Sequence, residues 1–410
     1  MLKKNKIITV LGLGYIGLPT AALLASKGYM VKGIDVNENV VHTINKGKIH
    51  IVEPDLDLAV QSAVDSGNLK AYLDVQPGDI YIICVPTPFH KESKIPTPNL
   101  SFVRAATESI TPLIKEGDIV ILESTSPVGT TEMIKNMLEV SGVPASSISI
   151  AYCPERVLPG KIMTELLDND RVIGGINEES TNIVGKFYRS FVNGKILKTD
   201  AKTAEMCKLT ENSFRDVNIA LANELSMLCS NSEIDVWELI RLANHHPRVN
   251  ILQPGAGVGG HCIAVDPWFI VSGDPETSRM IKIAREVNDS KPEWVVEKIK
   301  AKARNLNTKK VVCLGLAFKP DINDMRESPS IQVINSLISS GYSVSCVEPN
   351  IDNHDQYHLV SFEEALIDFE VIALLVNHKQ FISKSAQEML LAKSAMDFCG
   401  GLINKTYKKN

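Results

Sequence analysis

Closely spaced pairs of cysteines are absent from this sequence. Its eight cysteines are scattered, and no two of them form a Cys-x-x-Cys pair, which argues against a zinc ribbon and against a dithiol redox site. Cys84 in IYIICVP and Cys313 in VVCLGLAF lie in apolar runs, where a reduced thiol packs as a small hydrophobic group. We therefore expect no disulfide framework and no metal site, and a reducing cytoplasm as the location.

An excess of positive charge is also lacking. The 43 Lys and Arg residues are outnumbered by 48 Asp and Glu residues, which gives a formal net charge of −5 at pH 7. Nucleic acid is therefore not expected as a partner, and an anionic small molecule would need a local basic site. With 410 residues, 44% of them hydrophobic and 22% charged, the chain has the composition of a globular protein with two or three domains.

An uninterrupted apolar run of membrane-spanning length is the third absence. Residues 7–26, IITVLGLGYIGLPTAALLAS, carry no charge and follow a basic N-terminus, as a signal or anchor segment would. Glycines and Pro19 interrupt this run, and their spacing fits a strand, a tight turn and a helix better. We therefore expect no membrane association.

The three glycines of KIITVLGLGYIG predict a dinucleotide-binding turn. Gly12 permits the tight turn, Gly14 lets the backbone approach a pyrophosphate, and Gly17 lets the following helix pack closely on the strand. A second strand, YMVKGIDV, ends in Asp35, whose carboxylate would bind the ribose hydroxyls and repel a 2′-phosphate. A glycine turn without a ligand is the alternative, but the order of strand, turn, helix, strand and acid favours NAD as the cofactor.

The order of the expected elements predicts an α/β fold. Three more strand-like runs occupy residues 79–88, 118–130 and 148–157. From about residue 200 the pattern becomes helical, which predicts a long connecting helix and a shorter one, and a second unit of strand, helix and strand follows and ends in Glu348. We expect two Rossmann-like doubly wound parallel-sheet domains joined by a long central helical region, with the boundaries 1–200, 201–295 and 296–410.

Two groups of polar residues are placed by these elements. The carboxyl ends of the expected strands, where an open parallel sheet binds ligands, carry Thr87, Thr125 and Glu155. On the long helix, Lys208, Asn212 and Arg215 are spaced by four and three residues and share one face. A solvated helix face explains the second group equally well, so the spacing alone does not decide between the two interpretations.

The stretch PGAGVGGHCIAVDP contains the strongest candidate for a nucleophile. Four glycines within residues 255–260 precede Cys262, and a glycine-lined approach lets a substrate come close to the thiol. If a helical turn begins at Cys262, Asp266 lies beside the thiol, and we expect His261 to favour the thiolate. A thiolate next to a nicotinamide implies oxidation to the acid level through a thiohemiacetal and a thioester. A buried structural cysteine after a flexible loop is the alternative.

Six segments together resemble one known family in the right order over nearly the whole chain. They are GLGYIG, STSPVGTT, CPERVLPG, KLTENSFRDVNIALANEL, GVGGHCIAVDP and GLAFKPDINDMRESPS. The chain is similar to the nucleotide-sugar 6-dehydrogenases, the UDP-glucose/GDP-mannose dehydrogenase family. The resemblance implies a four-electron oxidation of a sugar C6 alcohol to a carboxylate with two NAD+, and a C-terminal domain that binds the UDP part of the substrate.

The resemblance also implies roles for individual residues. Cys262 would be the nucleophile of the aldehyde stage, Lys208 a proton donor or acceptor at the C6 oxygen, and Asn212 a ligand of that oxygen. Water for proton transfer and hydrolysis would be placed by Asp266, Thr125 and Glu155. NAD contacts are implied for Gly12, Gly14, Tyr15, Ile16, Gly17, Asp35, Thr87, Thr125 and Arg326. Substrate contacts are implied for Arg156, Val157, Lys208, Asn212, Arg215, His246, Arg248, Gly259 and Lys319.

The basic residues in this set supply the local positive charge that a diphosphate needs. In the family the long central helix forms a homodimer interface, and Arg248 can reach across it, so we expect a homodimer or a higher homo-oligomer.

The loop before the cysteine bears on which sugar is bound. The segment HHPRVNILQPGAGVGGHCIAVDPWF is most similar to the branch that oxidises UDP-N-acetyl-D-mannosamine, and the expected product is a uronic acid for a surface polysaccharide. Val258 stands where the glucose branch commonly has a bulky aromatic residue, and His261 also departs from that branch, so a less crowded loop would suit a 2-acetamido group. UDP-N-acetylglucosamine and UDP-glucose are the alternative substrates. A non-catalytic nucleotide-sugar binding protein and a two-electron dehydrogenase are the alternatives of another class.

Overall fold

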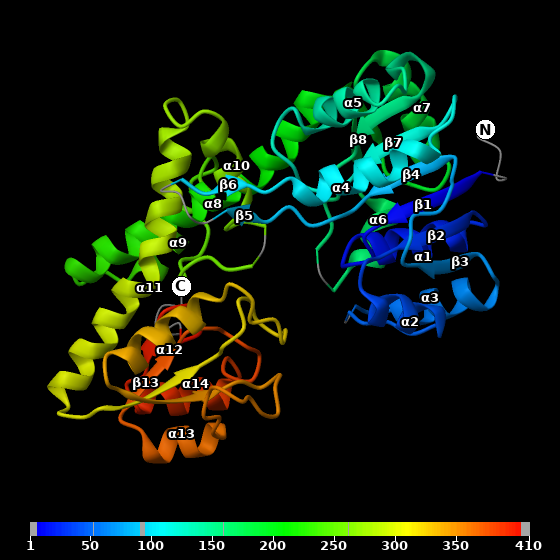
Figure 1. Cartoon of the computed structure of the whole chain (residues 1–410). Coiled ribbons are helices and arrows are strands. Elements are labelled where there is room, and N and C mark those ends of the chain that lie inside the picture. The colour runs from blue at the N-terminus through cyan, green and yellow to red at the C-terminus, as the bar shows by residue number, and fades with distance from the viewer. Residues whose placement is uncertain (1–5, 52, 91–94, 159, 261, 403–410) are drawn as a thin grey trace. The chain divides into compact units, whose positions relative to one another are not determined.

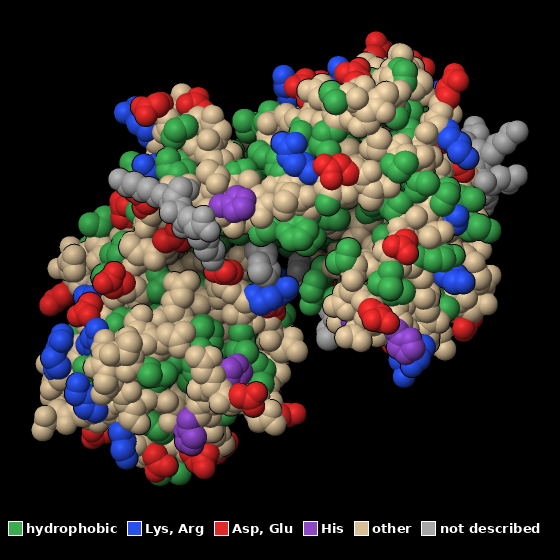
Figure 2. Space-filling view, in the orientation of Figure 1, with side chains coloured by type: hydrophobic (Ala, Val, Ile, Leu, Met, Phe, Trp, Pro, Cys, Tyr) green, Lys and Arg blue, Asp and Glu red, His purple; other side chains and the backbone are tan. Residues whose placement is uncertain are grey.

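The computed structural model describes residues 6–51, 53–90, 95–158, 160–260 and 262–402. The chain divides into two compact units, which are described separately (Figure 1). The N-terminal unit comprises Met1–Glu211 and Trp268–Asp274, and the C-terminal unit comprises Asn212–Pro267 and Pro275–Asn410. On the face drawn in Figure 2, basic and acidic side chains alternate over the surface of each unit, as the near-balanced composition predicts.

The N-terminal unit is built on an eight-stranded sheet with the order β10-β9-β8-β7-β4-β1-β2-β3. Every pairing in it is parallel except that of β8 with β9. The parallel, doubly wound sheet expected from the sequence is therefore confirmed, with one antiparallel pairing that the sequence does not reveal. The strands are β1 (Ile7–Leu11), β2 (Met30–Ile34), β3 (Leu69–Tyr72), β4 (Ile80–Ile83), β7 (Ile119–Leu122), β8 (Ser149–Tyr152), β9 (Arg171–Gly175) and β10 (Ile196–Asp200).

Helices cover both faces of this sheet, which is why the central strands β4, β7 and β8 are buried at every position. One hydrophobic cluster joins the sheet to α1 (Gly17–Ser26), α3 (Leu56–Asp65), α6 (Ile162–Asp168) and α7 (Glu178–Tyr188). A second cluster, on the other face, contains α4 (Ser101–Ile110) and α5 (Thr130–Val140). The remaining elements of this unit are α2 (Glu38–Asn45), the short pair β5 (Phe89–His90) and β6 (Thr97–Pro98), and α10 (Asp266–Gly273), which begins in the C-terminal unit.

Long helices follow the first sheet, as the sequence predicts. The 31-residue helix α8 (Ala201–Asn231) is followed by the shorter α9 (Val236–Ala243). A second long helix, α11 (Arg279–Asn305), has 27 residues and contains Pro292, and the sequence analysis does not identify it. Within the described residues, no helix combines the length and the apolar character needed to cross a bilayer.

The C-terminal unit contains a second parallel sheet, with the strand order β12-β11-β13-β14. One hydrophobic cluster packs α12 (Pro329–Ser339) and the last turns of α11 on one face of it, and another packs α13 (Phe362–Asp368) and α14 (Lys384–Ala392) on the other. The strands are β11 (Lys310–Leu314), β12 (Ser343–Val347), β13 (Val371–Leu374) and β14 (Met396–Asp397). The second α/β unit expected from the sequence is therefore confirmed.

The turn after the first strand has the same geometry in both sheets. In the N-terminal unit, Gly12 has a φ of +89° and donates its N–H to the last residue of β2 at 2.8 Å, and the next N–H is bound by Asp35 at 3.0 Å. In the C-terminal unit, Gly315 has a φ of +95° and donates to the last residue of β12 at 2.9 Å, and the next N–H is bound by Glu348 at 2.8 Å. In each sheet, the acid that follows the second strand thus accepts a hydrogen bond from the turn after the first strand and fixes that turn.

Candidate active site

The turn after β1 has room for a dinucleotide. A Cβ on Gly12 would lie 2.6 Å from the carbonyl oxygen of Cys84, and one on Gly17 would lie 1.8 Å from the carbonyl oxygen of Gly12, so neither position accepts a larger residue. A Cβ on Gly14 would meet no atom within 4 Å, which leaves its backbone open to a ligand. No side chain caps the N-terminus of α1 next to Ile16, as expected of a helix end that receives a pyrophosphate. The Leu18 N–H in its first turn donates to the Gly14 carbonyl oxygen at 3.1 Å. Tyr15 lies in this turn and is exposed.

Asp35 is positioned to meet the adenosine ribose of such a dinucleotide. It is half-buried, and its two oxygens accept hydrogen bonds from the backbone N–H groups of Leu13 at 3.0 Å and Asn37 at 2.9 Å. These bonds fix the carboxylate and leave each oxygen a further lone pair for a hydroxyl. Glu348, its counterpart in the second unit, is buried and is bonded by His378, Asn350 and backbone N–H groups, so the second sheet presents no such acid to a ligand.

Thr87 and Thr125 are brought together at the carboxyl ends of the adjacent strands β4 and β7. The Thr87 hydroxyl donates a hydrogen bond of 2.6 Å to the carbonyl oxygen of Thr125. The hydroxyl of the neighbouring Ser124 bonds the Val85 carbonyl oxygen at 2.7 Å. Both threonines are half-buried, and both lie at the sheet edge where the sequence places them.

Glu155, which follows β8, is buried with 7% exposure. Its carboxylate accepts a hydrogen bond of 2.5 Å from the Val157 N–H, and its other oxygen lies 3.6 Å from the buried guanidinium of Arg171. Burial raises the pKa of Glu155, and the positive charges of Arg171 and Lys208 oppose that rise. Lys208 is therefore close enough to lower the pKa of Glu155.

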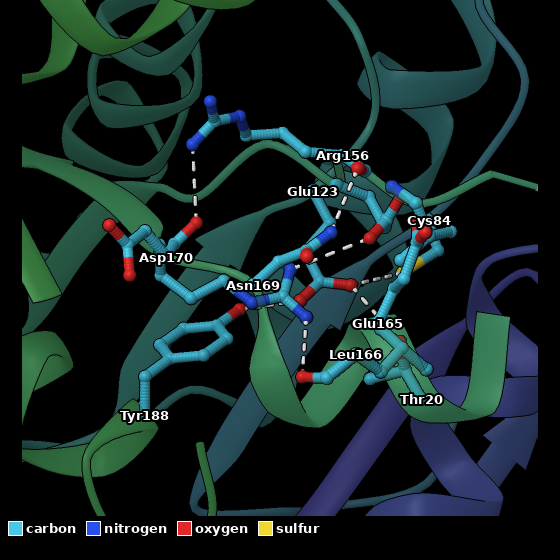
Figure 3. Close-up of polar contacts among 12 residues, drawn as sticks. Thr20, Cys84, Glu123, Arg156, Glu165, Leu166, Asn169, Asp170 and Tyr188 are labelled. Carbon is cyan, nitrogen blue, oxygen red and sulfur yellow. Dashed lines mark hydrogen bonds and ion pairs between the residues drawn. The ribbon is translucent and has the colours of Figure 1, made fainter. Parts of the chain in front are cut away.

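A buried polar cluster lies at the same end of the sheet and was missed by the sequence analysis (Figure 3). Glu123, at the end of β7, accepts hydrogen bonds from the Tyr188 hydroxyl at 2.5 Å and from the Cys84 thiol at 3.3 Å. Burial raises the pKa of Cys84 well above its usual range, and raises that of Cys153 to about 12. Neither thiol therefore competes as a nucleophile. The available signal was a charged residue in each of two otherwise apolar strands, Glu123 in VILES and Arg171 in RVIGG.

Arg156 is held by helix α8. Its guanidinium contacts both carboxylate oxygens of Glu211, at 3.0 and 2.7 Å. It also donates to the Asp170 carbonyl oxygen at 3.2 Å (Figure 3). The planar guanidinium is thus oriented by three contacts within the N-terminal unit. Lys208 lies one turn before Glu211 on α8 and is half-buried.

Helix α8 carries the polar face expected from the sequence. Lys208, Asn212 and Arg215 follow one another at helical spacings of four and three residues within it. The first two are half-buried and Arg215 is exposed. The Asn212 amide donates a hydrogen bond of 2.5 Å to the carboxylate of Asp266, which is 2% exposed. The structure therefore joins two residues that are 54 positions apart in the sequence.

Cys262 differs in exposure from the other seven cysteines, all of which are described. It is exposed, whereas the others are buried or half-buried. The helical turn expected after it is present, because the Asp266 N–H donates to the Cys262 carbonyl oxygen at 2.9 Å. The Asp266 carboxylate reaches Asn212 on α8. His261, expected to favour the thiolate, lies outside the described residues.

Three of the four glycines before Cys262 are required by packing against the loop after β11 and the first residue of α12. A Cβ on Gly259 would lie 2.7 Å from both the Glu327 carbonyl oxygen and the Pro329 ring, and one on Gly260 would lie 3.0 Å from the Phe318 ring. Gly257 has a φ of +149°, and its Cβ would lie 2.9 Å from Pro329. These contacts explain why residues 257, 259 and 260 are glycines, without any requirement from a substrate.

The remaining basic candidates lie in two surface segments of the C-terminal unit. His246 and Arg248 follow α9 and are exposed, and the Arg248 N–H donates to the His246 ring at 3.4 Å. Lys319 and Arg326 are exposed in the loop after β11, and the Arg326 guanidinium makes two hydrogen bonds to Asp324, at 2.9 and 2.6 Å. Gly259 packs against this same loop.

Three family models match successive parts of the chain. They describe the UDP-glucose/GDP-mannose dehydrogenase family: its NAD-binding domain matches residues 6–192, its central domain residues 202–290, and its UDP-binding domain residues 312–400. The chain belongs to this family. It is therefore an NAD-dependent oxidoreductase, and the glycine turn with Asp35 lies in its NAD-binding domain.

Individual members of the family are also similar over almost the whole chain. A UDP-N-acetyl-D-mannosamine dehydrogenase of Campylobacter jejuni is 52% identical, with 94% of this chain and 98% of that protein aligned. An NDP-N-acetyl-D-galactosaminuronic acid dehydrogenase of Ralstonia nicotianae is 50% identical, with 92% of each aligned. A solved UDP-D-ManNAc dehydrogenase structure from Pyrococcus horikoshii superposes with a TM-score of 0.88 at 38% identity, with 96% of each chain covered.

Proposed function

We propose that this protein oxidises C6 of UDP-N-acetyl-D-mannosamine from the alcohol to the carboxylate, which gives UDP-N-acetyl-D-mannosaminuronate. The observation that carries the proposal is an exposed Cys262 at the start of a helical turn, in a chain 52% identical to a UDP-N-acetyl-D-mannosamine dehydrogenase. A thiol is needed only when oxidation continues beyond the aldehyde, because the thioester retains the sugar until water attacks. We expect the reaction to consume two NAD+ for each sugar.

The side chains divide the chemistry between them. Bound NAD+ would supply the hydride acceptor for each of the two oxidations at C6. In the first, Lys208 takes the proton of the C6 hydroxyl, while Asn212 donates a hydrogen bond to that oxygen. The Cys262 thiolate then forms a bond to the aldehyde carbon. After the second oxidation, water attacks the thioester and the thiolate leaves, with Asp266, Thr125 and Glu155 placing the water.

We assign the binding of this substrate to three parts of the chain, residues 1–200, 201–295 and 296–410, of which the first binds NAD and the last binds UDP. The three family models, which end and begin close to these boundaries, support the assignment. Basic side chains are assigned to the diphosphate in this proposal and supply charge-assisted donors. They are Arg156 from the first part, Lys208, Arg215, His246 and Arg248 from the second, and Lys319 from the third. Val157 and Gly259 contribute backbone groups. Arg326 contacts either NAD or the substrate.

A second sugar is favoured by a specific observation. Because the chain is 50% identical to an NDP-N-acetyl-D-galactosaminuronic acid dehydrogenase, the N-acetylgalactosamine epimer is a candidate substrate beside UDP-N-acetylglucosamine and UDP-glucose. A panel of these UDP-sugars with purified protein tests the choice, with mass spectrometry of the products. The proposal expects the mannosamine compound to be used with the highest kcat/KM and two NADH for each sugar. Faster turnover of UDP-glucose contradicts it, and one NADH for each sugar supports a two-electron dehydrogenase instead.

Replacing the nucleophile separates catalysis from binding. Cys262→Ser is expected to lower the steady-state rate of NADH formation by at least about a thousandfold, because a hydroxyl is a poor leaving group from the acyl intermediate. Binding of NAD and of the UDP-sugar, measured by calorimetry, is expected to stay within about threefold. Full NADH formation by the variant would refute the thioester scheme, and a wild-type protein that binds both ligands without turnover would indicate a non-catalytic binding protein.

We further propose that the protein is a homodimer that works in the cytoplasm. The exposed apolar residues Phe214, Leu221 and Leu228 recur every seven residues on α8, and form one stripe with exposures of 67%, 49% and 55%. A self-complementary stripe on one helix suits a two-fold interface. The eight cysteines, none of which forms a disulfide and four of which are buried, support a reducing compartment, where the uronic acid would serve the synthesis of a surface polysaccharide.

A further inference from the structure

The loop that ends in Cys262 is anchored at its start by a buried asparagine. The N–H of Gly255 donates a hydrogen bond of 2.9 Å to the side-chain oxygen of Asn223 on α8. The side-chain nitrogen of Asn223 donates in turn to the side-chain oxygen of Asn288 on α11, also at 2.9 Å. The first residue of the glycine loop is therefore tied to both long helices.

The same buried chain continues to the other end of the loop. Asn288 donates to the side-chain oxygen of Asp216 at 2.8 Å and to its carbonyl oxygen at 3.0 Å. Arg285, one turn before Asn288 on α11, contacts the same oxygen of Asp216 and donates to the carbonyl oxygen of Ile263 at 3.4 Å. Ile263 is the residue after Cys262.

These four side chains are among the most deeply buried polar groups of the protein. Asn223, Asp216 and Arg285 are 0% exposed, and Asn288 is 1% exposed. Burying an ion pair and two amides stabilises a protein little or not at all compared with apolar residues of the same size. A connected polar network does, however, fix one geometry, because any shift leaves a buried donor or acceptor unpaired.

Helix α8 holds the loop at three points along one side. Asn212 bonds Asp266, Asp216 holds the Arg285 that bonds Ile263, and Asn223 bonds Gly255. The first two lie one turn apart and the third about two turns further on. The helix that carries Lys208 therefore also carries the anchors of the loop that carries Cys262.

We propose that Asn223, Asn288, Asp216 and Arg285 are positioning residues, which hold the Cys262 loop in register with helix α8 by fixing its two ends. The proposal rests on the proposed role of Cys262 as the nucleophile. A nucleophile reacts efficiently only when it is held within a few tenths of an ångström of its attack geometry. The packed glycines shape the middle of the loop, and the buried chain fixes where it starts and where it returns.

The end of the loop is tested by Arg285→Lys. The lysine keeps a positive charge beside Asp216, so the carboxylate is not left unpaired, but its single ammonium does not span Asp216 and the Ile263 carbonyl oxygen together. We expect kcat to fall by about tenfold or more and the affinity for NAD to stay within about twofold. Hydrogen exchange of the backbone amides of residues 262–266 is expected to become about tenfold faster.

The start of the loop is tested by Asn223→Ala. Loss of the side-chain oxygen leaves the Gly255 N–H without its partner, so exchange is expected to increase in residues 253–258. The two variants thus loosen different ends of one loop, and this distinguishes anchoring from a general loss of stability. Both are expected to slow NADH formation with little change in the KM for NAD.

Lys291→Met serves as the matched control. Lys291 lies on α11, is 2% exposed, joins α11 to α8 through the Ser226 hydroxyl, and contacts the Trp294 ring on its own helix. The variant removes a buried cation and an α8–α11 contact but none of the four anchoring side chains. We expect its kcat and the exchange of its loop amides to stay within about twofold of the wild type.

Two results would overturn the proposal. One is unchanged exchange and unchanged kcat in both Arg285→Lys and Asn223→Ala. The other is a loss of the same size in Lys291→Met, or faster exchange spread evenly over α8 and α11, either of which would show a purely structural role. Exchange is measured without substrate, so anchoring of the loop is tested even if no UDP-sugar is oxidised, and failure of the proposed reaction is recognised separately.

Discussion

The guanidinium of Arg171 controls the charge of Glu155, one of the residues proposed to place the hydrolytic water. The two side chains are 2% and 7% exposed and 3.6 Å apart. Glu123 lies in the same buried region, and its carboxylate is a second negative charge close to Arg171. Arg171 therefore lies close to two buried carboxylates, which makes it a sensitive position.

Arg171→Met is expected to raise the pKa of Glu155 further, because burial already raises it and the main opposing charge is lost. If ionised Glu155 is needed, kcat at pH 7 falls by at least about tenfold and the acid limb of the pH profile moves to higher pH. Arg171→Lys, which keeps the charge, should restore much of the rate. An acid limb that does not move in the methionine variant contradicts this role.

The buried pair of Glu348 and His378 gives the C-terminal unit a defined response to acid. Burial raises the pKa of Glu348, but hydrogen bonds from His378 and from backbone N–H groups outweigh it and hold the pKa at about 2. A carboxylate with a depressed pKa stabilises the fold above its unfolded pKa, and this stabilisation is lost as the pH falls from about 4 towards 2.

Glu348→Gln is accordingly expected to lower the free energy of unfolding at pH 7 by about 2 kcal/mol and to flatten its dependence on pH between about 5 and 2. Urea unfolding followed by fluorescence measures both, because Trp294 packs against the core of this unit. A variant with the wild-type slope in acid would show that Glu348 is not the group that titrates.

At the scale of elements, the apolar stripe on α8 makes the dimer testable. Leu221→Glu places a charge in the middle of the stripe, where a two-fold interface would bury it next to its own copy. Sedimentation velocity at micromolar concentration is expected to show a monomer. Ser230→Glu is the control, because Ser230 is exposed on the same helix but lies nearly opposite Leu228. Equal behaviour of the two variants would exclude the stripe as the interface.

Some elements could be predicted from the sequence because their signals are local. The glycine turn, its acid and the long α8 all follow from spacings within about 30 residues, and the family resemblance reached the same fold. Helix α11 was missed because Pro292 suggests a break, and because Arg285, Asn288 and Lys291 occupy the buried positions where a helix normally shows apolar residues. The antiparallel pairing of β8 with β9 depends on the path of the chain between the two strands, and no local sequence pattern indicates that path.

The site was predictable to the same extent. Residues with reactive or polar side chains at the ends of elements or on one helix face could be named, as Cys262, Glu155 and Lys208 were. Their partners could not, because Asn212 meets Asp266 and Asn223 meets Gly255 only after the chain has folded. The glycines were explained incompletely: the sequence suggested room for a sugar, whereas the structure shows close packing against Phe318 and Pro329.

At the scale of the whole molecule, the chain contains the same nucleotide-binding design twice and uses it differently. The first copy keeps a half-buried acid, Asp35, at the end of its second strand. The second copy encloses its acid, Glu348, in hydrogen bonds to its own backbone and to His378. The same turn is thus retained for folding in both copies, and only the first leaves its acid available to a ribose.

The packed glycines limit how the enzyme can be redesigned. Gly257, Gly259 and Gly260 face Pro329 or Phe318 and tolerate no side chain unless the loop after β11 or the start of α12 moves. Val258, half-buried among them, is the position where volume can be added or removed. An engineer who wishes to change the accepted sugar would therefore vary Val258 and leave these three glycines unchanged.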